Sequence, residues 1–150
     1  MKRIVLAVTA LVISATMFAQ GGTPGAAGKK AADAVKFKEL THDFGKIKQG
    51  VPVTYDFAFS NISGKPVVIE SALPSCGCTT PVKPEAPVAK GKEDKITAGF
   101  NAQLLGTFNK SITVKVAGID APLELHITGE VLNETDYAKY EKEKGPKKGK

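Results

Sequence analysis

Residues 54–60 read TYDFAFS, and this short run carries the clearest structural signal in the chain. Its aromatic residues Tyr55, Phe57 and Phe59 occupy every second position, with small or polar residues between them. Successive side chains of a β-strand point to opposite faces, so an alternation of period two is typical of a strand with one buried face. The run therefore predicts a strand whose aromatic face packs into a core.

The same alternation recurs on both sides of this strand. The further apolar runs lie around Val35 and Phe37, Val67 and Ile69, Ile96–Phe100, Phe108–Val116 and Leu123–Val131. Turn-forming residues rich in Gly, Asn and Ser separate them, at intervals of about ten residues. About seven short strands with this spacing predict an all-β fold, namely an immunoglobulin-like antiparallel β-sandwich.

The first 19 residues have the organisation of a secretory signal peptide. Lys2 and Arg3 precede an apolar run that ends at Phe18. This run is too short to favour a permanent membrane span, which needs roughly 20 apolar residues. We expect cleavage between Ala19 and Gln20, export to the periplasm or the cell exterior, and no permanent membrane span after cleavage. An uncleaved membrane anchor is the alternative.

The chain then divides into four segments with different compositions. We expect a signal peptide over 1–19, a flexible linker over 20–33, the β-sandwich over 34–131 and a Lys-rich tail over 132–150. The linker is rich in Gly and Ala and lacks apolar periodicity. In the tail, Thr135 is the expected cap of a short helix that runs to about Lys144.

Almost all of the basic residues in the chain are lysines. The formal net charge is +6, and loss of Lys2 and Arg3 with the signal peptide lowers it to +4. Arg3 is the only arginine in the sequence. Arginine is the residue best suited to bidentate contacts with phosphates and base edges, so we expect no nucleic-acid partner.

Several short blocks resemble a known bacterial family. In chain order they are His42-Asp43-Phe44-Gly45, Gly64-Lys65-Pro66, Pro74-Ser75-Cys76-Gly77-Cys78-Thr79, Gly106-Thr107-Phe108 and Gly129-Glu130-Val131. Their order resembles the family called domain of unknown function 1573, over roughly residues 35–131. Domains of that family are similar to the immunoglobulin-type modules of the abnormal-spindle and Hydin class. The resemblance implies the sandwich fold and export, and it implies no activity.

Cys76 and Cys78 are the only cysteines, with Gly77 between them. In an oxidising compartment, such a pair is read first as a disulfide. Residues i and i+2 of a strand lie about 6.6 Å apart, so a bridge needs a bend, which Gly77 permits. So small a ring restricts the unfolded chain only slightly. An inert structural pair and a redox-active pair both remain open.

Metal binding by the same two cysteines is a further alternative. Two thiolates suit a soft ion such as Cu(I) or Zn(II), but a closed zinc site takes four ligands. His42 is the histidine that we consider as an additional ligand, although it is more often a turn residue in such a position. We therefore predict no required cofactor, with a soft metal ion at Cys76 and Cys78 as the exception.

No arrangement of residues predicts catalysis. A cysteine nucleophile requires a histidine that activates it and an acid that orients the histidine. His42 and Asp43 are the available pair, but they are neighbours on a predicted strand, so their side chains point to opposite faces. We expect no catalytic residues, no enzyme activity and no small-molecule substrate. The sequence instead favours an exported binding or structural module of the cell envelope with a protein partner. Thiol-dependent redox chemistry or soft-metal binding at the Cys-Gly-Cys motif is the alternative function.

Overall fold

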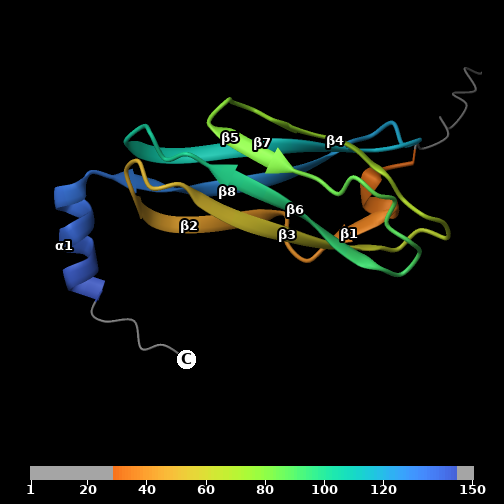
Figure 1. The fold of residues 1–150 in the computed structure, drawn as a ribbon, viewed down its shortest axis with the longest axis horizontal. Helices are drawn as coiled ribbons and strands as arrows, with labels where there is room; N and C mark the ends of the chain where they lie inside the picture. Colours follow the sequence, from red (N-terminus) through yellow and green to blue (C-terminus); the bar gives the residue numbers. More distant parts are fainter. Residues whose placement is uncertain (1–28, 145–150) are drawn as a thin grey trace, which may run out of the picture.

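The structure is a computed structural model, and it describes residues 29–144 (Figure 1). These residues form a β-sandwich followed by one helix. The elements in chain order are η1 (Ala31–Asp33), β1 (Val35–Phe37), β2 (Thr41–Lys48), β3 (Val53–Asn61), β4 (Ile69–Pro74), β5 (Thr79–Val82), β6 (Glu93–Phe100), β7 (Gly106–Val116), β8 (Leu123–Leu132) and α1 (Glu134–Lys144).

Two four-stranded sheets pack face to face, in the orders β1-β3-β6-β5 and β2-β8-β7-β4. The predicted β-sandwich is confirmed, with eight strands in place of about seven. The antiparallel arrangement holds for every strand pair but one, because β2 runs parallel to β8. The chain leaves β1 in one sheet and continues as β2 in the other, without reversing into a hairpin. Side-chain alternation is the same in both orientations, so the sequence pattern does not distinguish them.

The core lies between the sheets and is built from the alternating faces that the sequence predicts. On β3, Phe57 and Phe59 are fully buried, and in the other sheet Ile112, Leu125 and Ile127 are fully buried as well. Each such side chain contributes about 1.5–3 kcal/mol relative to an exposed position. The apolar alternation therefore accounts for the two-layer architecture.

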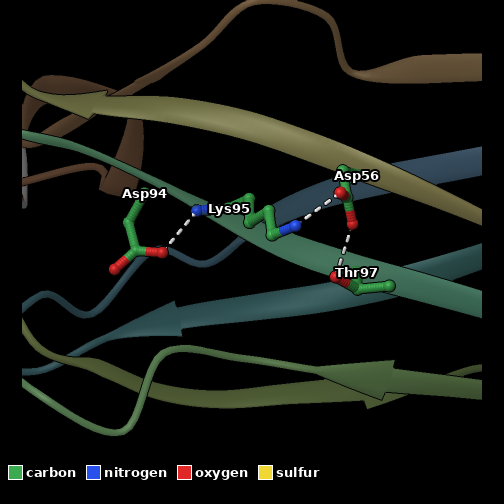
Figure 2. Close-up of polar contacts among 4 residues, drawn as sticks. All are labelled: Asp56, Asp94, Lys95 and Thr97. Atoms are coloured by element: carbon green, nitrogen blue, oxygen red, sulfur yellow. Dashed lines mark hydrogen bonds and ion pairs between the residues drawn. The ribbon is translucent and has the colours of Figure 1, made fainter.

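The outer face of the β3–β6 pair carries the polar half of the same alternation (Figure 2). The Nζ of Lys95 lies 2.6 Å from Oδ2 of Asp56, and the hydroxyl of Thr97 donates to Oδ1 of Asp56 at 2.5 Å. The backbone N–H of Lys95 donates to Asp94 at 2.8 Å. The hydrogen bonds from Lys95 and then Thr97 lower the pKa of Asp56. This cluster is solvent-exposed, so its contribution to stability is small.

The fold begins earlier than the composition indicates. Ala31 is fully buried, and its N–H donates to the carbonyl of Ala121 at 3.0 Å. Residues 30–33, which we expected in the linker, therefore belong to the domain. A small alanine fits against a packed sheet edge, and composition alone does not separate that use from a linker. The predicted signal peptide with its Ala19–Gln20 bond, and the linker up to residue 28, lie outside the described residues.

The tail forms the helix α1, and Figure 1 shows it at one end of the sandwich. Its cap is Asn133, whose Oδ1 accepts from the N–H of Asp136 at 2.9 Å, and not Thr135 as we expected. An ion pair of 2.6 Å joins Lys48 on β2 to Glu134. No helix between residues 29 and 144 has the length and apolar character required to cross a membrane.

Candidate functional site

The two cysteines lie in the connection between the edges of the two sheets. β4 is the last strand of its sheet and β5 the last strand of the other, and residues 75–78 join them. The N–H of Ser75 donates to the carbonyl of Ser111 at 2.9 Å, which holds the start of the connection. The N–H of Asn101 donates to the carbonyl of Cys78 at 3.1 Å, which holds its end. Both sheets therefore anchor this turn.

Cys76 and Cys78 form a disulfide, as the first reading of the pair predicts. Their Cα atoms are 5.3 Å apart, closer than the roughly 6.6 Å of an extended chain, so the backbone bends between them. Gly77 does not adopt a left-handed φ, and a Cβ there would meet nothing within 4 Å. The bend thus does not require glycine. Both cysteines are half-buried.

Thr79 brings a hydroxyl to the disulfide, and sequence reasoning missed it. The residue is 1% exposed, and its Oγ1 lies 3.7 Å from Sγ of Cys76 and 3.9 Å from Sγ of Cys78. Sulfurs in a disulfide carry no hydrogen, so the hydroxyl is the donor. One feature of the sequence could have indicated this contact: Thr79 is a polar residue at the first inward-facing position of the strand that follows the two cysteines.

A hollow lies beside Cys78, and we call it the leucine hollow. Its volume is about 190 Å³, and its lining includes Cys78, Phe100, Leu104, Leu105 and Lys110. Leu104 and Leu105 are 82% and 54% exposed, although both are large and apolar. They sit between β6 and β7, where the sequence offers no alternation to mark them. The structure thus places exposed apolar side chains next to the disulfide.

His42 lies away from the cysteines. It is on β2, and β2 and β4 are the two opposite edges of one sheet. The imidazole stacks on the ring of Tyr55 with the centroids 3.5 Å apart, and Phe44 packs edge-on against it at 4.8 Å. His42 therefore fills the seam between β2 and β3, and the structure does not bring it to the predicted metal ligands.

Metal ligation by the pair stays a prediction for its reduced form. Thiolates are the ligands of soft metals, and the sulfurs of a disulfide are not thiolates. Within residues 29–144, no group of three or more His, Cys, Asp or Glu side chains is arranged to hold a metal ion. A metal that needs a third ligand of these types would have to take it from elsewhere, whereas a two-coordinate Cu(I) would need none.

The Asp-Phe-Gly and Gly-Glu-Val blocks meet at the β2–β8 contact. Asp43 accepts a hydrogen bond from the N–H of Gly45 at 2.8 Å, at an irregularity in the pairing of β2 with β8. A Cβ on Gly129 would lie 2.8 Å from the carbonyl oxygen of Gly45 and 2.8 Å from Cζ of Phe108. Gly129 therefore serves close packing, and Asp43, Lys46 and Glu130 line an open hollow of about 390 Å³ beside it.

The fold is similar to that of several solved structures at low sequence identity. The seventh PapD-like (ASH) domain of human CEP192 matches with a TM-score of 0.56 and 12% identity, over 87% of this chain and 99% of that domain. A protein of unknown function from Porphyromonas gingivalis W83 matches with a TM-score of 0.54 and 11% identity. That match covers 65% of this chain and 46% of the other, so the chain spans less than half of that protein.

A family 123 glycoside hydrolase from Clostridium perfringens also contains a similar region, with a TM-score of 0.54 and 12% identity, over 69% of this chain and 26% of the enzyme. At such identities the likeness concerns the fold alone. No curated protein matches the sequence significantly. The model of one family, whose description is "protein of unknown function", matches residues 35–131. The chain is accordingly a member of the DUF1573 family, and its domain is a β-sandwich that resembles immunoglobulin-like and PapD-like domains.

Proposed function

We propose that the mature chain is an exported, non-catalytic module of the cell envelope that binds a protein partner, and that the leucine hollow and its surroundings form the contact. The observation that carries this proposal is the exposure of Leu104 and Leu105 beside Cys78. Exposed apolar groups that cluster around a hollow in a soluble domain are typical of interaction sites, whereas single scattered ones are not.

Two further features support this proposal. β5 is a four-residue strand at the edge of its sheet, and Val82 at its end is 65% exposed. An open edge strand offers unpaired backbone groups to an extended partner segment. The signal-peptide pattern of the first 19 residues and the disulfide both suit a compartment outside the cytoplasm. We place the module in the periplasm or outside the cell on these grounds.

The test is site-specific photo-crosslinking in cells of the native host. A photoreactive residue replaces Leu105 in one variant and Ile62 in a matched control, because the two are 54% and 52% exposed and lie after opposite ends of the β3–β6 pair. We expect one discrete adduct from position 105, the same protein by mass spectrometry in each replicate, and its loss when excess unlabelled domain competes. Equal labelling from both positions would contradict the proposal.

Thiol-dependent chemistry at Cys76 and Cys78 is a second candidate function. The buried hydroxyl of Thr79 against both sulfurs favours it, because an oriented donor stabilises a thiolate better than apolar surroundings do. Thiol titration across a series of glutathione buffers tests the redox form. Mass spectrometry of the reduced chain with Cu(I) or Zn(II) tests the metal form. A pair that no buffer reduces, and that retains no metal, would exclude both.

A further inference from the structure

The two cysteines of the disulfide have different surroundings. Within the described residues, the wall of the leucine hollow includes Cys78 and not Cys76, and Cys78 also packs against the buried core. In thiol–disulfide exchange, a thiolate attacks one sulfur and displaces the other, along the S–S axis. A sulfur nucleophile seated in the hollow is therefore adjacent to Cys78 and not to Cys76, and its attack on Cys78 would make Cys76 the leaving group.

The hydroxyl of Thr79 is placed to receive that leaving group. Its Oγ1 lies 3.7 Å from Sγ of Cys76 and 3.9 Å from Sγ of Cys78, so the hydroxyl can donate to the sulfur of Cys76 when that sulfur leaves. Among the described residues these two sulfurs are its only hydrogen-bond partners. A hydroxyl that donates to the departing sulfur stabilises the negative charge, and a better stabilised thiolate leaves faster.

The hollow also offers a positive charge to an incoming thiolate. Lys110 is half-buried in its lining, and it forms no ion pair with any other residue between 29 and 144. A lysine ammonium close to a sulfur nucleophile favours its ionised form. The remaining wall is largely apolar, through Phe100, Leu104 and Leu105. Such a hollow suits a cysteine that is flanked by an apolar side chain.

We propose, on the basis of the thiol-dependent candidate function, that the hollow receives a reduced dithiol segment of another exported polypeptide and that a cysteine of this segment attacks Cys78. The partner's thiolate forms a bond to Sγ of Cys78 while the Cys76–Cys78 bond breaks, and Cys76 leaves as a thiolate that takes up a proton. The second thiolate of the partner then attacks the partner's own sulfur in the mixed disulfide, and Cys78 leaves in turn.

The exchange balances without another oxidant. The partner's dithiol loses two electrons and two protons and becomes a disulfide, while Cys76 and Cys78 gain them and become thiols. One oxidised chain therefore oxidises one dithiol. The proposal concerns this single turnover, and it assigns different roles to the two cysteines.

The direction of attack is tested with a probe that cannot complete the second step. The purified, oxidised mature chain is mixed with a synthetic peptide that carries a single cysteine next to leucine. The reaction is quenched with acid, free thiols are alkylated, and the adduct is mapped by mass spectrometry. We expect the peptide on Cys78 and the alkyl group on Cys76, in about tenfold excess over the reverse assignment.

Variants test the contributions of the hollow and of Thr79. Leu105→Ser slows adduct formation with the leucine peptide about fivefold, because one apolar contact is lost, whereas the matched control Ile62→Ser leaves the rate unchanged. Thr79→Val slows it about threefold, and Thr79→Ser, which keeps the hydroxyl, restores it. The serine variant separates the role of the hydroxyl from a folding defect of the valine variant.

The outcomes distinguish the two levels of the proposal. An adduct found equally on both cysteines, or mainly on Cys76, overturns the direction of attack and leaves the thiol function in place. No adduct at all, under conditions in which oxidised glutathione reacts with the same peptide, overturns the thiol function itself. Equal rates for the leucine peptide and a serine analogue overturn the assignment of the hollow as the binding site.

Discussion

The two lateral edges of the sandwich are built in opposite ways. At the β2–β3 edge, the rings of His42, Phe44 and Tyr55 close the seam between the sheets, with His42 and Tyr55 stacked at 3.5 Å. At the β4–β5 edge, a disulfide-bonded turn joins the sheets and leaves a hollow beside Cys78. The aromatic rings at the first edge pack against one another, whereas the second edge has the exposed side chains of Leu104 and Leu105 beside the disulfide.

This difference separates residues that look reactive from residues that are accessible. His42 carries a chemically versatile side chain, yet its ring packs on both of its aromatic neighbours. Cys78 belongs to a half-buried pair that borders open space. We therefore assign packing to the first edge and partner contact to the second, and substitutions at the two edges should affect different properties.

The largest expected effect separates Gly129, on the inner strand β8 where it contacts β2, from Gly77 in the disulfide-bonded turn. In Gly129→Ala the new Cβ would lie 2.8 Å from the backbone oxygen of Gly45, so β2 or β8 must shift, and we expect a loss of about 2–4 kcal/mol. In Gly77→Ala the new Cβ meets nothing within 4 Å, and stability should change by less than about 0.5 kcal/mol. Urea unfolding measures both. Equal losses of stability in the two variants would contradict the expected difference between the two positions.

The double variant Cys76→Ser/Cys78→Ser tests how much the disulfide contributes to the stability of the fold. The bridge closes a ring over a sequence separation of only 2, so the loop-entropy argument gives a loss of about 1.5 kcal/mol on its removal. The measurement is the urea midpoint of the oxidised wild type against the variant. A loss above about 4 kcal/mol would show that the turn mainly stabilises the fold, and it would weaken its assignment to function.

His42→Ala tests the packing role of the opposite edge. The stacked pair with Tyr55 should contribute about 1 kcal/mol beyond its buried area, so thermal and urea unfolding should both show a loss of that order. Crosslinking from position 105 should be unchanged in this variant. A variant with normal stability but no crosslink would place His42 in the functional surface instead.

The smallest effect is expected at Asp56, on the outer face of the β3–β6 pair, where its carboxylate contacts Lys95 and Thr97 (Figure 2). Hydrogen bonds from Lys95 and Thr97 lower the pKa of Asp56 below its ordinary value of 3.8. A lowered acid pKa gives stability that is present above pH 3.8 and is lost as the pH falls through the folded-state value.

Asp56→Asn checks this assignment. The difference in urea midpoint between wild type and variant should be small at neutral pH, because the pair is exposed, and it should vanish as the pH falls below 3.8. Asp94→Asn is the matched control on β6. A difference that grows towards acid pH would have the opposite sign and would exclude the assigned pKa shift.

The apolar alternation allowed most of the fold to be predicted from the sequence. Period two marks which residues of a strand face inward, so Phe57 and Phe59 were identified as core residues before their neighbours were known. The alternation does not depend on the direction of the neighbouring strand, so the parallel pairing of β2 with β8 could not be predicted from it. The burial of Ala31 could not be predicted, because a buried alanine does not differ in sequence from the other residues of a Gly- and Ala-rich stretch.

The candidate site was predicted only in part. The expected oxidising compartment favours a disulfide between Cys76 and Cys78, although their spacing requires the backbone to bend. Leu104 and Leu105 were missed, since their relation to Cys78 depends on how the β4–β5 and β6–β7 connections meet, and Thr79 was missed although it directly follows Cys78. His42 is a candidate metal ligand in the sequence because imidazole often binds metals. The fold places it at the edge of the sheet opposite to the cysteines.

The most direct measurement of the central claim is the state of the two cysteines in intact cells of the native host. Cells are quenched with acid, free thiols are alkylated at once, and the chain is examined by mass spectrometry without reduction. The account predicts a mature chain that begins at Gln20 and carries an intramolecular Cys76–Cys78 disulfide. A chain that retains residues 1–19 with both cysteines alkylated would contradict export and the oxidised turn together.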